Sequence, residues 1–354
     1  MSLPSVPPRV SVVVPAFDGE RFLSQALDGI LGQTYRDLEL IVVDDGSTDA
    51  TPRILAEAAA RDPRVRVERL ERSGHTAATR HGQGLARGEL LAHCDHDDVW
   101  EPTRLERGVV FLDAHPDVAV VGSQATLIDA EGRPIGRIQH PCEPEAVARA
   151  LPSSNTFCHS SVLSRTSVIR AVGGHRVAFR QASDYDLWLR VSERHRLANL
   201  PEPLVRYRVH FRNMTVLDPE AAGGGGVAAR AAARTRREGR PDPLEDRPYA
   251  VDELLRATGA DAHDVLVEGF GLALHLADLA RAARARDAER VCLHRAYGLG
   301  CRIGMSKSRA RHLLERASCL HGEEGRRLAA FGARWAARAV RWFGPRALLG
   351  RTIG

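Results

Sequence analysis

Short runs of β-branched residues alternate with helical patterns along the first part of the chain. Residues 9–14 (RVSVVV) and 38–43 (LELIVV) are two such runs, and their composition is typical of buried parallel strands. Between them, apolar residues recur at helical spacing, namely Phe22, Leu23, Ala26, Leu27, Ile30 and Leu31. A strand, a helix and a strand within about 35 residues form a βαβ unit, which requires the two strands to be parallel.

The same alternation continues through residue 121. A helix is predicted to be capped by Thr51, with Pro52 at its first position, and another over 76–87. Further strands are predicted at 65–68, 89–93 and 118–121. We therefore expect an α/β fold with a mostly parallel sheet flanked by helices. Ligands of such sheets bind beyond the C-terminal strand ends, and three polar clusters follow such ends: Pro15–Asp18, Asp44–Ser47 and Asp95–Asp98.

Beyond residue 150 the pattern is less regular. A helix is predicted near 184–195, followed by the extended segment PLVRYRVH at 203–210. From 216 to 248 the chain loses its apolar periodicity apart from alanine, which indicates a linker or a helix with a loop. Leucines recur after Tyr249, so a helical and basic C-terminal region is predicted for 249–354. The first domain is expected to span 1–215.

Composition bounds the class of protein. A length of 354 residues allows two domains, and 44% apolar with 27% charged residues is ordinary for a soluble globular chain. No stretch approaches the roughly 20 apolar residues that cross a bilayer, and the N-terminus lacks the apolar core of a signal peptide. We therefore expect a cytoplasmic protein. The six cysteines are widely scattered, which favours reduced thiols over disulfides or a zinc site.

The segment HCDHDD at 93–98 carries three carboxylates directly after a predicted strand. In an extended chain, residues two apart point the same way, so Asp95 and Asp97 can face one ligand. Carboxylates are the hard oxygen ligands that Mg²⁺ or Mn²⁺ prefers, usually shared with substrate phosphates. The alternative is an exposed acidic turn that caps the helix starting near Glu101-Pro102.

Two other acidic segments are candidates. In VDDGSTD (43–49), Asp44 and Asp45 can accept a hydrogen bond from a ribose hydroxyl or from the imide N–H of a uracil or thymine base. A helix-entry turn is the alternative. In RQASDYDLWLRV (180–191), Asp186 completes a capping box with Ser183. Asp184 has no such structural task, which makes it a candidate general base.

Four segments together resemble the family-2 glycosyltransferases of the GT-A fold. They are VSVVVPAFDGERFLSQALDGILGQTY, LIVVDDGSTDAT, GELLAHCDHDDVW, and RQASDYDLWLRV with PLVRYRVH. They span roughly residues 9–215 in the family's order. The resemblance implies a catalytic GT-A domain in which a sugar moves, with inversion, from a nucleotide-diphosphate donor, with Mn²⁺ or Mg²⁺ as the cofactor.

The resemblance also implies roles for single residues. The nucleotide base would be lined by Pro15, Ala16 and Phe17 and hydrogen-bonded by Asp45. Asp18 stands where the family often has Asn. Asp95 and His96 would contact the ribose and diphosphate, and Asp97, with Asp95, would hold the metal. Asp184 would be the general base of the reaction, and Ser183 stands where the family usually has Glu. His210 is either a third metal ligand, a diphosphate contact or a surface histidine.

One motif departs from the family. Members commonly have G-x-S-A-A-R-N-x-G where this chain has residues 74–82, GHTAATRHG. The arginine expected to hold the diphosphate therefore aligns with Thr79, and Arg80 follows one position later. One residue on a helix is a turn of about 100°, so Arg80 replaces that arginine only if its side chain swings back.

Two other classes of protein compete with this interpretation. A sugar-1-phosphate nucleotidyltransferase would open on a glycine-rich basic loop after the first strand, whereas this chain has PAFDGE. A non-catalytic nucleotide-sugar-binding module is the other alternative. The expected partners are a UDP- or dTDP-sugar and an acceptor from a cell-surface polymer, a lipid-linked saccharide or a natural product. No nucleic-acid partner is expected.

The C-terminal segment RRLAAFGARWAARAVRWFG (326–344) is amphipathic when projected as a helix. Apolar residues gather on one side, at Leu328, Phe331, Trp335, Ala339 and Trp342, and five arginines gather on the other. Such a pattern is typical of a helix at an anionic membrane surface. The alternative is a terminal helix that packs its aromatic side chains on the protein. A helix at an anionic membrane surface would place the protein at the inner face of the cell membrane.

We predict that the full-length chain sediments with liposomes that contain anionic lipid, whereas a chain ending at Glu324 does not. Each arginine near an anionic surface contributes about 1 kcal/mol, so binding should require anionic lipid and weaken in high salt. Liposome co-sedimentation measures this. Equal sedimentation of both chains would mean that the segment packs on the protein instead.

Overall fold

The computed structural model describes residues 6–210, 212–282 and 286–306, together with 308, 312 and 313. The chain divides into two compact units, Met1–Arg208 with Ala228–Ala260 and Val209–Val227 with Asp261–Gly354. The segment 326–344, with its predicted membrane contact, lies outside the described residues.

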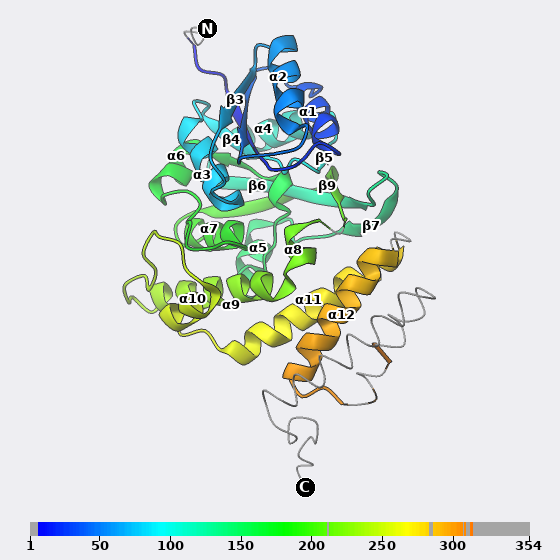
Figure 1. Ribbon diagram of the computed structural model, residues 1–354. Helices are drawn as coiled ribbons and strands as arrows, with labels where there is room; N and C mark the ends of the chain where they lie inside the picture. Colours follow the sequence, from blue (N-terminus) through cyan, green and yellow to red (C-terminus); the bar gives the residue numbers. More distant parts are fainter. Residues whose placement is uncertain (1–5, 211, 283–285, 307, 309–311, 314–354) are drawn as a thin grey trace. The chain divides into compact units, whose positions relative to one another are not determined.

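The first unit opens with the predicted parallel strands. Its elements are β1 (Val10–Ala16), α1 (Leu23–Leu31), β2 (Leu38–Asp44), α2 (Thr51–Arg61), β3 (Val65–Arg69), α3 (His75–Leu85) and β4 (Leu90–His93). The strands lie in the order β3-β2-β1-β4, and every pair is parallel. The α/β fold predicted from the sequence is therefore confirmed for this half (Figure 1).

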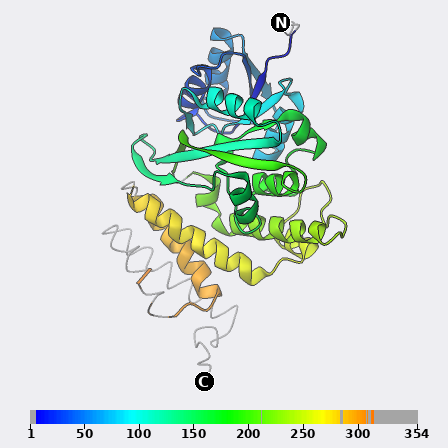
Figure 2. The same cartoon turned by 180° about the vertical axis from the view of Figure 1, so that it is seen from behind.

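The sheet continues with strands of mixed direction. The elements that follow are β5 (Val99–Trp100), α4 (Arg104–Ala114), β6 (Val118–Ile128), β7 (Pro134–Ile138), α5 (Pro144–Ala150), a 3₁₀ turn (His159–Ser161), β8 (Leu163–Arg165), α6 (Thr166–Ala171), α7 (Ser183–Val191) and β9 (Arg196–Arg208). Strand β8 is antiparallel to both β4 and β6, and β6 runs parallel to β9. The strand predicted at 118–121 is thus the start of a longer strand, which runs beside β9 in Figures 1 and 2.

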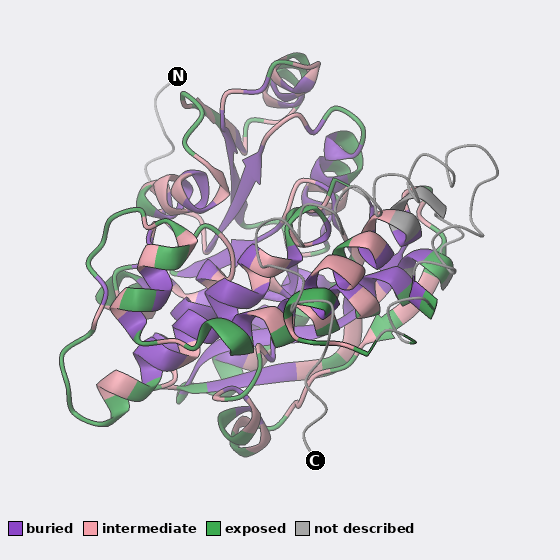
Figure 3. Cartoon of the chain, turned by 60° about the horizontal axis from the view of Figure 1, so that its bottom comes forward, coloured by how far each residue is buried: buried purple, intermediate pink, exposed green. Residues whose placement is uncertain are grey.

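Both faces of the sheet are covered by helices. On one face, alternate residues of β1 such as Val12 and Val14 join a core with Leu27 of α1, Leu55 of α2 and Leu105 of α4. Figure 1 shows α3 on the other side of these strands, and the strands are coloured as buried in Figure 3.

Helix α3 lies very close to the sheet at Gly82. A Cβ atom on Gly82 would lie 2.5 Å from Cγ1 of Val13, which is too close for a real contact. A glycine is therefore needed for this helix to approach the strands.

The second unit is helical. It includes α8 (Met214–Leu217) and the first residues of α9 (Pro219–Arg237), and it continues through α11 (Ala262–Ala282) and α12 (Arg286–Arg302). Its core joins residues of α11 and α12 to Val216. Helix α10 (Val251–Thr258) belongs to the first unit. Among the described residues, no helix is long and apolar enough to cross a membrane.

The segment predicted as a linker, 216–248, contains helix α9. Alanine is the best helix former, and the many alanines offset the cost of the glycine run at 223–226. One of these glycines has a packing reason, because a Cβ on Gly223 would lie 2.8 Å from the backbone nitrogen of Gly269 in α11. The sequence pattern alone could not show this contact, since the two positions are far apart in the chain.

Helix α7 does not begin with the predicted capping box. Its N-cap is Ala182, and no side chain caps it. The carboxylate of Asp186 is instead fully buried between two arginines: Arg190 Nε donates to it at 2.9 Å and Arg176 Nε at 3.0 Å. Burial alone would raise the pKa of Asp186, but the charges of Arg190 and Arg176 lower it below its ordinary value. Asp186 therefore has a structural role, as predicted, but through ion pairs.

We predict that Asp186→Asn destabilises the fold, because it leaves two buried guanidinium groups without their carboxylate. Breaking a buried pair in this way costs about 3–5 kcal/mol. Since the folded pKa of Asp186 is lowered, its contribution is present above an unfolded pKa of about 4 and is lost as the pH falls through the folded pKa. The difference in melting temperature between wild type and variant should therefore narrow in acid.

The matched control is Asp242→Asn. This aspartate also pairs with Arg176, at 2.9 Å, but its side chain is 28% exposed, so its removal should cost much less. Equal melting temperatures for Asp186→Asn and wild type at pH 7 would contradict the structural role.

Candidate functional site

The three predicted polar segments meet at one edge of the sheet. They follow β1, β2 and β4, which are neighbours in the sheet. The first two are joined by hydrogen bonds from Asp18 N to Ser47 Oγ (3.0 Å) and from Thr48 N to Asp18 Oδ1 (2.9 Å). The first and third touch at Gly19, where a Cβ would lie 2.6 Å from the ring of His96. The sequence therefore located this edge correctly.

Thr51 also belongs to this junction. It was predicted as a helix cap, but it is the first residue of α2, and the N-cap is Ala50. Its hydroxyl accepts a hydrogen bond from Gly19 N at 2.8 Å. The side chain is thus used to fasten the loop after β1 to helix α2, a contact across thirty residues of sequence that local capping patterns do not reveal.

Asp45 accepts several hydrogen bonds in a nearly buried position. Ser73 donates through its backbone N and its hydroxyl, both at 2.7 Å, and Gly74 N donates at 2.9 Å. Arg72 completes the set with an ion pair. By contrast, the neighbouring Asp44 stabilises its own turn, because it accepts from Ser47 N at 2.9 Å.

Arg72 was not singled out in the sequence. Its guanidinium carbon lies 3.5 Å from the ring centroid of Phe17 while the same group pairs with Asp45. A planar N–H donor therefore lies over an aromatic ring and binds a carboxylate. The side chain of Arg72 is 53% exposed, so it is the partner of Asp45 that can leave most easily. Pro15 and Ala16 lie beside this place as the buried last residues of β1.

The three carboxylates of the 95–98 segment have different surroundings. Asp98 is buried and accepts hydrogen bonds from Ser160 Oγ at 2.5 Å and from Arg208 N at 2.8 Å. Burial and the charges of Asp97 and Asp95 raise the pKa of Asp98 well above its ordinary value. Asp98 is thus a structural residue, and the ligand contacts of Asp95 and Asp97 stay a prediction.

Arg208 holds the same segment from β9. Its Nε donates to the carbonyl of Asp97 at 2.8 Å, and its Nη2 donates to Gln25 Oε1 at 2.8 Å. The guanidinium also lies over the ring of Phe22, 4.6 Å from its centroid. Arg208 therefore places a positive charge behind the acidic loop and links that loop to helix α1. Arg208 lies in the segment PLVRYRVH, whose sequence alone predicts no role for it.

His75, the first residue of α3, faces the acidic loop from the front. Its Nε2 lies 3.0 Å from Asp95 Oδ1. Burial lowers the pKa of His75, but the hydrogen bond and charge of Asp95, with the charges of Asp97 and Asp184, raise it overall. Burial likewise opposes ionisation of Asp95, yet the hydrogen bond and charge of His75 hold the pKa of Asp95 well below its usual range. His75 and Asp95 therefore each stabilise the charged form of the other.

Asp184 lies in the first turn of α7. Its Oδ2 accepts a hydrogen bond from Asn155 Nδ2 at 2.8 Å. The helix starts directly after Ala182, whose φ of 60° is in the left-handed region. A residue without glycine's freedom rarely adopts this conformation, and the surrounding structure must hold it there. The start of α7 is therefore fixed at a small energetic cost, two residues before Asp184.

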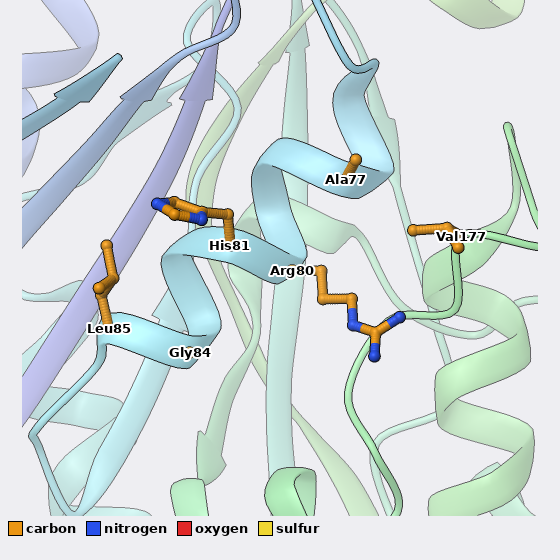
Figure 4. Close-up of a pocket in the computed structure, with 6 residues that line it drawn as sticks. All are labelled: Ala77, Arg80, His81, Gly84, Leu85 and Val177. Carbon is orange, nitrogen blue, oxygen red and sulfur yellow. The ribbon is translucent and has the colours of Figure 1, made fainter. Parts of the chain in front are cut away.

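The diphosphate role predicted for Arg80 finds no support in the geometry. Arg80 Nη1 forms an ion pair with Asp246 at 2.6 Å. In Figure 4 its side chain extends from α3 toward the segment that carries Val177. There it lines a cavity of about 440 Å³ with Ala77, Val177 and other residues of α3. Thr79 is buried and donates its hydroxyl to His75 O at 2.8 Å. A diphosphate contact by Arg80 stays a prediction that requires this ion pair to open.

The metal ligands also stay a prediction. His210 lies in the second unit, so the structure does not test it as a partner of Asp97. Among the described residues, no group of three or more His, Cys, Asp or Glu side chains is arranged to hold a metal. The hard oxygens of Asp95 and Asp97 nonetheless fit Mg²⁺ or Mn²⁺, because such ions are commonly held by one or two carboxylates with the rest of the ligands from phosphates and water.

Comparison with known proteins agrees with this arrangement. The model of the family "Glycosyl transferase family 2" matches residues 11–184. The putative glycosyltransferase EpsE of Bacillus subtilis (strain 168) is 36% identical over 207 residues, which cover 57% of this chain and 73% of EpsE.

Two solved structures share the fold. The crystal structure of S. aureus TarS 1–349 in complex with UDP-GlcNAc has a TM-score of 0.54 and 18% identity, covering 91% of this chain and 92% of that one. The mannosyltransferase PcManGT from Pyrobaculum calidifontis, in complex with GDP-Man and Mn²⁺, has a TM-score of 0.51 and 19% identity, covering 98% of this chain and 86% of that one.

Proposed function

Because the chain belongs to glycosyl transferase family 2, we propose that it transfers a sugar, with inversion, from a UDP- or dTDP-sugar to an acceptor hydroxyl. The observation that carries the proposal is the position of three polar segments at one edge of the sheet, where His75 Nε2 lies 3.0 Å from Asp95 Oδ1. Asp97 follows in the same segment as Asp95, and the separate carboxylate Asp184 lies in the first turn of α7. A site that holds a diphosphate and takes a proton beside it needs these groups together.

The nucleotide base would occupy the place of the Arg72 guanidinium. A uracil or thymine ring is flat and carries an imide N–H, so it can lie on Phe17 and donate to Asp45 as Arg72 does in the free protein. This supports a base with an N–H donor. The related structures bind UDP-GlcNAc and GDP-Man, and guanine also carries such an N–H, so the choice of base is a matter for the donor test below.

The sugar and diphosphate would lie over the 95–98 segment. Asp95 and Asp97 would hold a divalent cation, as the Mn²⁺ complex of the mannosyltransferase suggests. Such an ion, when bound, stabilises the negative charge that grows on the departing diphosphate. His75 fixes the orientation of Asp95 through its hydrogen bond, and Arg208 fixes the backbone at Asp97.

Asp184 would take the proton of the acceptor hydroxyl as that oxygen attacks the anomeric carbon. A single displacement inverts the configuration and needs no covalent intermediate on the enzyme, so one carboxylate is enough. Asp186 is not available for this task, because two arginines hold it in the core. The ion pairs of Asp186 therefore favour Asp184, two residues earlier, as the general base.

A non-catalytic binding module is the remaining alternative, and a donor test distinguishes it. Release of nucleotide from UDP-, dTDP- or GDP-sugars in the presence of Mn²⁺ is expected of the transferase. Binding of a nucleotide sugar without any release would favour the module.

We predict that chelation abolishes this turnover and that Mn²⁺ or Mg²⁺ restores it. Asp97→Ala should stay folded, because it removes one charge from a repelling cluster, and should weaken Mn²⁺ binding in the presence of UDP by at least about tenfold. Paramagnetic resonance of Mn²⁺ measures the binding. Glu131→Ala removes a carboxylate whose side chain is 56% exposed and serves as the control. Full activity in EDTA would show that turnover does not require a divalent cation.

We predict that Asp184→Asn lowers kcat by about 10²–10⁴-fold, the usual effect of losing a general base, while donor affinity changes little. Turnover and calorimetric titration with the same nucleotide sugar measure the two quantities. Glu193→Gln, which removes a carboxylate just after α7, is the matched control and should keep wild-type turnover. Near wild-type kcat for Asp184→Asn would overturn the assignment.

A further inference from the structure

The loop 151–157 is fastened to helix α7 at both of its ends. Near its start, Tyr185 Oη donates a hydrogen bond to Leu151 O at 2.8 Å. At its end, the ring of Phe157 packs against that of Trp188, with centroids 5.8 Å apart. Tyr185, Trp188 and Phe157 are all buried. The loop and the first turns of α7 therefore form one packed body.

Asn155, in the middle of this loop, reaches the proposed base. Its Nδ2 donates to Asp184 Oδ2 at 2.8 Å, and its Oδ1 accepts from Phe157 N at 3.1 Å. A backbone N–H can only donate, so it fixes the amide oxygen on the side of Phe157 and the amide NH₂ on the side of Asp184. The amide therefore cannot flip without losing both bonds.

A hydrogen bond to one carboxylate oxygen also determines where the other one points. With Oδ2 held by Asn155, the Asp184 side chain cannot rotate freely, and Oδ1 keeps a fixed direction. A general base must lie within hydrogen-bond distance of the proton that it takes, so this direction matters for the rate.

We propose that Asn155 is a positioning residue: its amide holds the Asp184 carboxylate in the orientation in which it accepts the proton of the acceptor. This inference rests on the role of Asp184 in the proposed function. Within the described residues, Asn155 has the two contacts that this role requires. Its amide oxygen is anchored by Phe157 N, and its amide NH₂ donates to the carboxylate of Asp184.

Two variants separate positioning from simple support of the loop. Asn155→Asp keeps an oxygen that can accept from Phe157 N, so the loop keeps its anchor, but it turns a second carboxylate toward Asp184. Asn155→Ala loses both bonds. If Asn155 only supported the loop, Asn155→Ala would be the more harmful change. If it positions the base, Asn155→Asp is the more harmful one, because two carboxylates repel each other.

Tyr185→Phe is the matched control. It removes a second side-chain hydrogen bond between the loop and α7, to Leu151 O, and leaves the Asp184 side chain unchanged. The charge of Asp184 also raises the pKa of His75, and His75 is common to all variants. Comparison at one fixed pH therefore isolates the effect of residue 155.

The experiment measures release of UDP from UDP-GlcNAc, and of GDP from GDP-mannose, with Mn²⁺, for wild type and the three variants. Misplacement of a catalytic group by about 1 Å can cost 10²-fold. We expect kcat to fall about tenfold for Asn155→Ala and about a hundredfold for Asn155→Asp, with the donor KM unchanged, and to change less than threefold for Tyr185→Phe. In Asp184→Asn, adding Asn155→Ala should cause little further loss.

Crystal structures of the same variants supply a readout that does not depend on turnover. The side chain at 184 should leave its place in Asn155→Asp and keep it in Tyr185→Phe. An unmoved Asp184, or equal kcat for Asn155→Asp and wild type, would overturn the inference even if Asp184→Asn is inactive. By contrast, full activity of Asp184→Asn, or no release of nucleotide from any UDP-, dTDP- or GDP-sugar by wild type, would contradict the proposed function itself.

Discussion

The repulsion among Asp95, Asp97 and Asp98 is the constraint around which the site is built. The fold compensates this charge from two sides: Arg208 and Ser160 hold the segment from behind, and His75 faces Asp95 from the front. These partners come from β9, from the 3₁₀ turn after the 151–157 loop and from the start of α3. Three parts of the chain that are distant in sequence thus contact the acidic loop at one edge of the sheet.

The position of α3 shows how packing sets the electrostatics. His75 reaches Asp95 because α3 lies close to the strands, and that closeness depends on Gly82, which has no Cβ to meet Val13. Thr79 then fastens the first turn by donating to His75 O. Where the family usually has an arginine, this chain has a small buried side chain, and the group of α3 that contacts Asp95 is the imidazole of His75, one turn earlier.

The parallel half of the sheet could be predicted from the sequence because each βαβ unit is local. Apolar runs, helical spacing and loop residues lie within a few dozen positions of each other, and the edge that they define was found. The second half depends on pairings such as β4 with β8 and β6 with β9, which no local pattern encodes. The same limit applies to side chains. Asp186 was predicted to have a structural role, but in a capping box, because its partner Arg176 is ten residues away. The contacts of Arg72 and Asn155 cross nearly thirty residues.

Ala182 has a consequence for how this site could change over time. Its left-handed backbone costs about 1–2 kcal/mol for a residue with a Cβ, so the neighbouring contacts of α7, rather than local preference, keep the helix start in place. Glycine at this position would remove the strain but would also gain freedom in the unfolded chain, and since the strain is the larger effect, glycine should stabilise the fold slightly. The cost would lie in backbone freedom. A glycine adopts more backbone conformations than an alanine, so a change to glycine would raise the melting temperature while it loosens the carboxylate that the reaction depends on.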